Sequence, residues 1–140
     1  AALLAGPLEI DALVLESVYT TISQAVNNRV RHRVGVFTPV VAPLLLVQLS
    51  PRLGVRTADL RPIDYIANVD CPVLIAAGGA DMHTTVLDTE KLFAAAVEPK
   101  ELVIFPSATH VDLLDYDTEW YEERVMGFLV RHLSKRTTEI

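Results

Sequence analysis

Three short apolar runs recur along the chain, and longer segments of helical periodicity lie between and after them. The runs cover residues 11–17 (DALVLES), 71–79 (CPVLIAAGG) and 101–106 (ELVIFP), and each contains β-branched residues, which favour strands. A short run that is apolar at successive positions is typical of a strand in a parallel sheet. We therefore expect three strands and expect the first two to be buried on both faces.

Capping signals predict where helices begin and end. Thr21 and Gln24 have the spacing of a capping box and Gly35 provides a stop, so we expect a helix between them. Thr85 and Asp88 have the same spacing ahead of a second helix. A last helix is expected over about residues 117–135, where Tyr121, Val125, Phe128, Leu129 and His132 recur at helical spacing.

Strands that alternate with helices pair in parallel through right-handed crossover connections. The sequence thus predicts an α/β fold in a single domain, residues 1–140, with three parallel strands and flanking helices. The segment of about residues 36–60 departs from this order, because Pro39, Pro43 and Pro51 divide it into short apolar helices. We interpret it as a short helical lid over a pocket. The alternative is a loop that fills core volume.

Composition limits the classes of partner. The chain is 51% hydrophobic with a mean hydropathy of +0.32, which is typical of a folded core. Its net charge of −6 argues against a nucleic-acid partner. The exception is the basic segment RVRHR (residues 29–33), which we interpret as cations at a helix C-terminus, with a phosphate-binding patch as the alternative.

The single cysteine and the length of the apolar segments predict the cellular location of the protein. Cys71 cannot form an internal disulfide, so a reducing, cytoplasmic location is expected. The longest apolar run, residues 40–49, is about half the length of a membrane-spanning helix and contains Pro43. We expect no membrane partner.

Two polar side chains follow consecutive predicted strands. Asp81 comes after the second strand and a Gly-Gly-Ala loop, and His110 comes after the third strand and a Pro-Ser-Ala-Thr loop. Since ligands of open parallel sheets bind beyond the carboxyl ends of the strands, we expect both side chains at one edge of the sheet. There a carboxylate orients an imidazole for proton transfer, which makes the pair a candidate catalytic acid and base.

Other polar residues lie near this predicted edge. Ser17 and Tyr19 end the first strand and are candidate pocket residues, and His83 is a pocket residue or a solvated turn. A metal site formed by Asp81, His83, His110 and Asp112 is the weaker interpretation, because no helical His pair and no Cys ligand supports it. We expect neither a metal nor another cofactor.

Three stretches, IDALVLESVYTTI, RPIDYIANVDCPVLIAAGGADMHTTV and PKELVIFPSATHVDLL, resemble the C-terminal half of an α/β-hydrolase. The likeness is strongest to small-lid serine hydrolases of the esterase and serine aminopeptidase-like groups. The resemblance implies a partial α/β-hydrolase fold in which Asp81 is the acid and His110 the base of a catalytic triad. It implies hydrolysis of an ester or amide bond in a small to medium, mostly apolar substrate.

The sequence departs from this family at the nucleophile. No Gly-x-Ser-x-Gly motif occurs in the 140 residues, and AALLAG (residues 1–6) has the end of a helix but no capped beginning. We expect the chain to start within a larger domain, just after the nucleophile, and therefore to be inactive alone. The apolar first strand would then need a cover, either a second copy or an N-terminal half. The alternative function is a non-catalytic interaction or regulatory module.

Overall fold

The sheet has the predicted parallel arrangement. The computed structural model describes residues 10–54 and 56–133. Its strands β1 (Leu13–Glu16), β2 (Val73–Gly78) and β3 (Lys100–Phe105) pair in the order β1-β2-β3, and both pairs are parallel. The expected α/β fold with three parallel strands and flanking helices is therefore confirmed. The predicted helix end at residues 1–6 lies outside the described residues.

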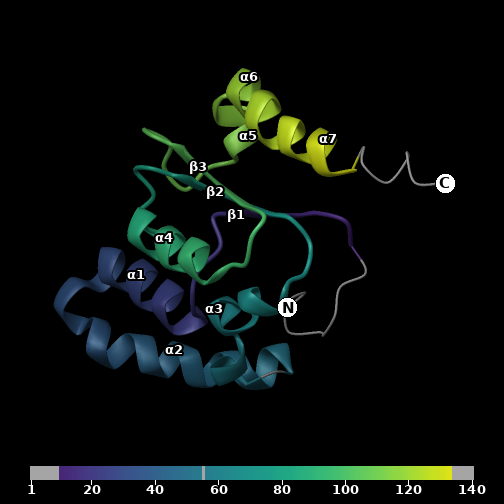
Figure 1. The fold of residues 1–140 in the computed structure, drawn as a ribbon. Coiled ribbons are helices and arrows are strands. Elements are labelled where there is room, and N and C mark those ends of the chain that lie inside the picture. Colours follow the sequence, from purple (N-terminus) through teal and green to yellow (C-terminus); the bar gives the residue numbers. More distant parts are fainter. Residues whose placement is uncertain (1–9, 55, 134–140) are drawn as a thin grey trace.

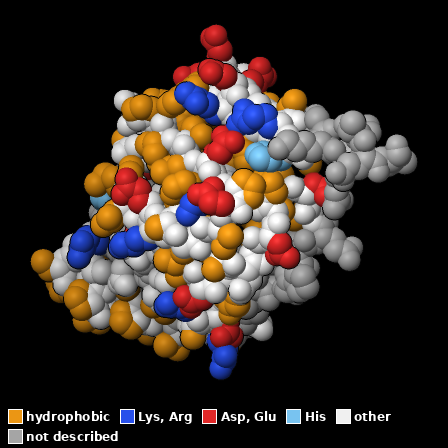
Figure 2. Space-filling model, viewed as in Figure 1, with side chains coloured by type: hydrophobic (Ala, Val, Ile, Leu, Met, Phe, Trp, Pro, Cys, Tyr) orange, Lys and Arg blue, Asp and Glu red, His pale blue; other side chains and the backbone are white. Residues whose placement is uncertain are grey.

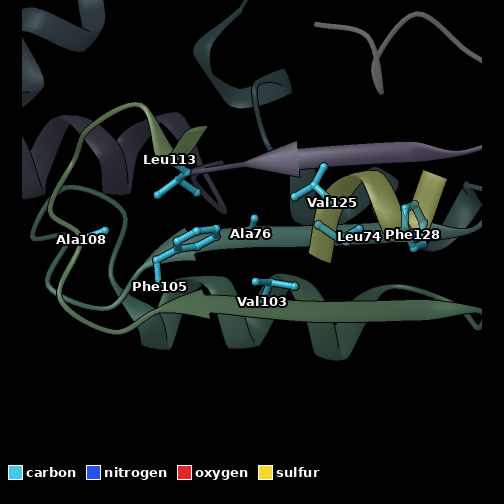
Figure 3. Close-up of a cluster of buried hydrophobic side chains, with 8 residues drawn as sticks. All are labelled: Leu74, Ala76, Val103, Phe105, Ala108, Leu113, Val125 and Phe128. Carbon is cyan, nitrogen blue, oxygen red and sulfur yellow. The ribbon is translucent and has the colours of Figure 1, made fainter. Parts of the chain in front are cut away.

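β2 is the centre of the fold, because it is buried on both faces and its side chains alternate between two apolar clusters. Leu74 and Ala76 lie in a cluster with Val103 and Phe105 of β3 (Figure 3). The C-terminal helical region covers that face. Val73 and Ile75 point to the other face, where the cluster also contains Ile66, Leu92 and Ala96. Figure 1 shows the two layers, with α4 on one side of the sheet and α5, α6 and α7 on the other.

β1 is not buried on both faces, contrary to expectation. Its residues Leu13, Val14 and Leu15 are half-buried, and Glu16 is exposed. The reason is its position at an edge of the described sheet, where only β2 pairs with it. The Tyr121 hydroxyl donates a hydrogen bond to the Glu16 carboxylate and so ties the end of β1 to the C-terminal helices.

The segment after β1 forms a pair of helices. α1 (Ile22–Val34) begins at Thr21, whose hydroxyl accepts from the Gln24 N–H at 3.2 Å, and ends at Gly35, which has a φ of 52°. A 3₁₀ turn (Gly35–Phe37) then leads into α2 (Thr38–Leu53), which packs alongside α1 (Figure 1). The predicted start and stop of the first helix are confirmed.

The prediction that prolines divide the next segment is wrong, because α2 continues for 16 residues through Pro43 and Pro51. Each of these prolines leaves a carbonyl one turn earlier without its usual N–H partner. Pro39 and Val47, which carry those carbonyls, are exposed, so water can bind them. Exposure therefore lowers the cost of both internal prolines.

α2 carries an apolar surface. Figure 2 shows hydrophobic side chains gathered over this helix, and the exposed ones include Val40, Leu44 and Val47 of α2, with Val36 and Phe37 of the turn before it. By length and composition alone, Ile22–Arg52 is one segment of the described chain that is apolar enough to cross a membrane. That is weak evidence for a membrane span, since the segment folds as two helices joined by a turn.

The remaining helices frame the sheet. A 3₁₀ turn (Thr57–Asp59), α3 (Pro62–Tyr65) and another 3₁₀ turn (Ile66–Asn68) lead to β2, and α4 (Val86–Ala95) joins β2 to β3. The helix expected over about residues 117–135 is helical throughout its described part, as α6 (Thr118–Tyr121), a π-helical turn (Glu122–Met126) and α7 (Gly127–Leu133), and the short helix α5 (Leu113–Tyr116) precedes it. Asp117 separates α5 from α6, because its carboxylate caps the Trp120 N–H. Val125 and Phe128 of the expected apolar stripe are buried.

Two glycines let the loops after β2 and β3 come together. A Cβ on Gly78 would overlap the Ala108 carbonyl, and one on Gly79 would overlap the backbone of Pro106. Neither glycine has a positive φ, so close backbone approach, and not a special turn conformation, requires glycine here. The Gly79 N–H donates to the Phe105 carbonyl at 2.7 Å across this contact.

Replacing Gly79 by alanine should separate the two loops. We expect Gly79→Ala to lower the free energy of unfolding by about 1–3 kcal/mol, the usual cost of overpacking, because the added methyl meets backbone that cannot rotate away. Urea unfolding followed by circular dichroism measures this change. Gly127→Ala is the matched control, since the nearest atom to its Cβ is the flexible Arg131 guanidinium at 3.4 Å. Equal stabilities of the two variants would contradict the tight contact.

Candidate active site

Asp81 and His110 meet beyond the carboxyl ends of β2 and β3. The His110 Nδ1 atom lies 2.8 Å from the Asp81 Oδ2 atom. The Asp81 side chain has no exposed surface, whereas the His110 side chain is 41% exposed. The predicted meeting of these two side chains at one edge of the sheet is therefore observed. It follows from two adjacent parallel strands whose loops are held together by the glycine contacts.

The Asp81 carboxylate is held by four contacts. Its Oδ1 atom accepts from the His83 N–H at 2.7 Å and from the Thr84 N–H at 3.0 Å. Its Oδ2 atom accepts from the Thr84 hydroxyl at 2.7 Å and contacts His110. The backbone donors come from the turn directly after Asp81, so the local sequence fixes the orientation of the acid.

These contacts decide the charge of Asp81. Burial raises the pKa of this carboxyl, but the hydrogen bonds from Thr84, His110 and the His83 backbone together outweigh burial and leave the pKa below its ordinary 3.8. An ionised carboxylate only accepts hydrogen bonds, so His110 donates through Nδ1–H. The neutral ring then has its lone pair on Nε2, where it can accept a proton.

His83 packs against the catalytic candidate. Its ring lies edge-on to His110 at 5.3 Å between centroids and edge-on to His32 of α1 at 5.8 Å. The His83 Nδ1 atom is buried without a hydrogen-bond partner among the described residues. Burial, followed by the charges of Arg29 and His110, lowers the pKa of His83.

A hollow of about 470 Å³ lies beside His110. Its described lining is rich in arginine and histidine, and comprises Arg29, His32, Arg33, Ala80, Met82, His83, Thr109 and His110. The structure thus places His83 at the hollow, as predicted, but Ser17 and Tyr19 are not among these lining residues. Ser17 has a positive φ of 48° and a buried hydroxyl without a partner in the described part of the chain. The pocket role of Ser17 and Tyr19 stays a prediction.

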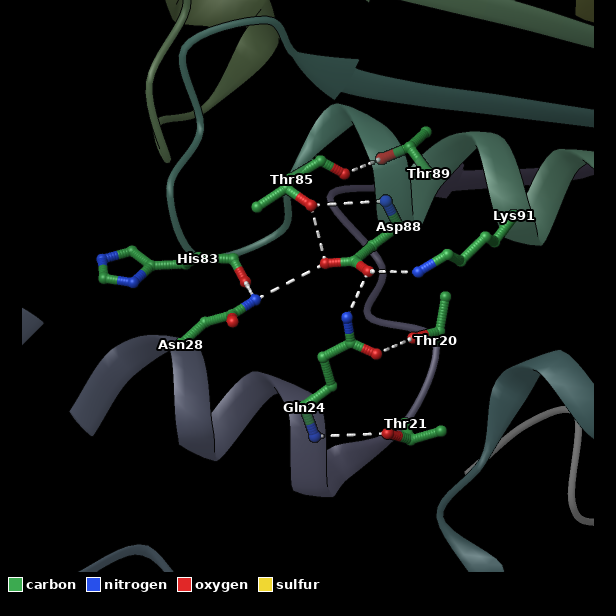
Figure 4. A network of polar contacts seen from close by, with 9 residues as sticks. All are labelled: Thr20, Thr21, Gln24, Asn28, His83, Thr85, Asp88, Thr89 and Lys91. Atoms are coloured by element: carbon green, nitrogen blue, oxygen red, sulfur yellow. Dashed lines mark hydrogen bonds and ion pairs between the residues drawn. The ribbon is translucent and has the colours of Figure 1, made fainter. Parts of the chain in front are cut away.

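α1 is fixed to the site by a polar network that sequence reasoning missed (Figure 4). The buried Asp88 carboxylate of α4 accepts from the Gln24 side chain and from Asn28 at 3.5 Å, and Asn28 also donates to the His83 carbonyl at 3.0 Å. Gln24 and Asp88 were assigned only to local caps. The sequence did contain a signal for this network, because Gln24 and Asn28 lie four residues apart, which places their two side-chain amides on one face of α1.

No metal site forms where the alternative interpretation placed one. Among residues 10–54 and 56–133, no three His, Cys, Asp or Glu side chains converge as metal ligands would. Asp112, one of the four candidates, instead caps α5 by accepting from the Leu114 N–H at 2.9 Å.

Thr84→Val tests what keeps Asp81 ionised. Because folding lowers the pKa of Asp81, the ionised carboxylate stabilises the fold above pH 3.8, and this stability is lost as pH falls through the folded-state pKa. Removing the Thr84 hydroxyl should raise the pKa of Asp81 and cost about 1–3 kcal/mol at pH 7, and the cost should shrink below pH 3.8.

Urea unfolding at pH 7 and at about pH 3, with ¹³C NMR titration of the Asp81 carboxyl, measures both effects. Thr89→Val is the control, because the Thr89 hydroxyl is equally buried but donates to the Thr85 carbonyl at 3.2 Å. A cost of Thr84→Val that does not change with pH would contradict this assignment.

Comparisons with known proteins agree with this architecture. No protein-family profile matches the chain. An uncharacterized protein of Mycobacterium tuberculosis is 39% identical over 75 residues, which are 54% of this chain and 25% of that protein. The chain thus spans only a quarter of that relative's length.

Solved structures match nearly the whole chain. An esterase of Pyrococcus furiosus has a TM-score of 0.67 at 18% identity, over 93% of this chain and 47% of the esterase. An α/β-hydrolase of Penicillium has a TM-score of 0.57 at 15% identity, over 89% of this chain and 56% of that protein. At these identities the likeness concerns the fold. Together with the three parallel strands and their flanking helices, it shows that this chain has a partial α/β-hydrolase fold.

Proposed function

We propose that this chain is the part of a serine hydrolase that carries the acid and the base of its catalytic triad. The observation that carries the proposal is the 2.8 Å contact of a buried, ionised Asp81 with Nδ1 of a partly exposed His110. In this proposal Nε2 of His110 takes the proton of an attacking hydroxyl and returns it to the leaving group. Asp81 orients the ring and stabilises the imidazolium that forms.

The nucleophile comes from outside the printed sequence. We propose a serine on a Gly-x-Ser-x-Gly turn encoded upstream of Ala1, because the resemblance orders nucleophile, acid and base in that way. The outer edge of β1 supports this proposal, since only β2 pairs with β1 in the described sheet. A further part of the same hydrolase, or a second copy of the chain, would cover that edge.

The reaction is hydrolysis of an ester or amide bond in a small to medium substrate. α2, within the segment interpreted as a lid (about residues 36–60), lies beside α1, whose arginines border the hollow. A mostly apolar substrate stays a prediction, and the arginines and histidines that line the hollow at His110 favour a polar or charged group on it. The cytoplasmic location remains a prediction.

A non-catalytic interaction or regulatory module is the second candidate. The absence of a Gly-x-Ser-x-Gly motif from the 140 residues favours it. One observation distinguishes the two candidate functions, namely whether the reading frame upstream of Ala1 encodes that motif. An open frame with the motif supports the hydrolase, and a frame without it supports the module.

Activity of the full-length gene product tests the hydrolase. With a p-nitrophenyl ester as substrate, we expect His110→Ala and Asp81→Asn each to lower kcat by about 10⁴-fold, because each removes the oriented base. Asp115→Asn is the matched control, since Asp115 is exposed on α5 and does not contact His110. Retention of kcat by Asp81→Asn, at equal folded fraction by circular dichroism, would overturn the proposal.

A further inference from the structure

The hollow beside His110 has an excess of positive groups. Arg29 and Arg33 lie four residues apart on α1, so they share one face of the helix. Both are exposed, and neither has an ion-pair partner among residues 10–54 and 56–133. Three histidines complete the basic lining, and none of the described lining residues is acidic. Figure 2 shows Lys or Arg side chains over α1 in this part of the surface.

This concentration of one sign of charge is unusual for a chain whose net charge is −6. The charge of Arg29 already acts on the His83 ring, whose pKa it lowers together with burial and His110. Like charges at close range cost free energy unless a counter-charge is present. The described chain supplies no acidic side chain to the hollow other than the Asp81 behind His110, so the natural counter-charge is a bound anion.

Interaction with the helix dipole explains only some of the arginines in the basic segment (residues 29–33). Arg31 and Arg33 lie in the last turn of α1, where cations complement the helix dipole, whereas Arg29 precedes that turn. Arg31 points elsewhere, since it lines a separate hollow with Asn27, Asn28 and Gly35. The three arginines of α1 thus face different ways, since Arg29 and Arg33 line the hollow beside His110 and Arg31 lines the other one.

We propose that Arg29 and Arg33 form an anion subsite that binds a carboxylate or phosphate group of the substrate next to His110. Guanidinium groups suit this task, because their planar forks donate two parallel hydrogen bonds to either group. The inference rests on the proposed function and deepens it. The substrate class is an ester or amide that carries a carboxylate or a phosphate beside the bond to be cleaved.

The subsite also has a consequence for catalysis. When His110 takes up a proton, its imidazolium faces the two guanidinium groups across the hollow. A bound anion offsets that repulsion, so an anionic substrate supplies part of the charge that its own proton transfer needs. A neutral substrate of the same size lacks this help and should react more slowly.

NMR titration of this chain tests the subsite without requiring hydrolysis. The probes are monomethyl succinate, methyl phosphate and the neutral methyl butyrate, and the observed signals are the ring protons of His32, His83 and His110. We expect at least one anionic probe to shift these signals saturably and methyl butyrate to leave them unchanged. Binding should weaken as ionic strength rises from about 0.01 M to about 1 M, since the screening length falls from about 30 Å to about 3 Å.

Single variants locate the binding. Arg29→Gln and Arg33→Gln should each weaken binding about fivefold or more, because each removes one exposed charge partner. Arg31→Gln is the matched control, since it removes an equal charge from the same helix but lines the other hollow, and it should change binding less than about twofold. The anion that binds more tightly identifies the group as carboxylate or phosphate.

Three outcomes would overturn the subsite: no shift with either anion at low salt, equal shifts with methyl butyrate, or equal weakening by Arg31→Gln. These outcomes leave the hydrolase proposal standing, because they do not involve Asp81. Conversely, anion binding at Arg29 and Arg33 without hydrolysis by the full-length gene product would remove the catalytic proposal and leave an anion-binding site.

Discussion

The contact between the Asp81 carboxylate and His110 constrains the rest of the site. A carboxylate with no exposed surface stays ionised only if donors replace the water that it loses. Thr84 and the His83 backbone supply those donors from the next turn, and His110 supplies the last one from the neighbouring loop. The geometry thus demands two loops in backbone contact, which Gly78 and Gly79 permit because they have no Cβ.

The part of the site that was predictable follows from rules of parallel sheets. The apolar runs and caps located the strands and most helix starts, and the carboxyl ends of adjacent parallel strands brought Asp81 and His110 together. The burial of each strand was less predictable, because it depends on which elements pack against that strand. β1 has the composition of a central strand but lies at an edge of the described sheet.

The errors have local causes. The prolines of α2 were judged by their intrinsic effect, which the exposed position of the helix reduces. The basic character of the hollow was missed because it depends on where α1 docks. That docking is determined by Asp88, which is distant in sequence from Gln24 and Asn28.

The docking of α1 also determines how α2 and the arginines of α1 are held in place. Gln24 in the first turn of α1 and Asn28 in its middle are bound to α4 and to the loop of His83, whereas α2 is joined to α1 through the three-residue turn Gly35–Phe37. α2 also packs against α1, so the contacts made by Gln24 and Asn28 anchor both helices to the rest of the fold. No residue of α2 is among the described lining of the hollow, so the placement of Arg29 and Arg33 beside His110 depends on how α1 is held.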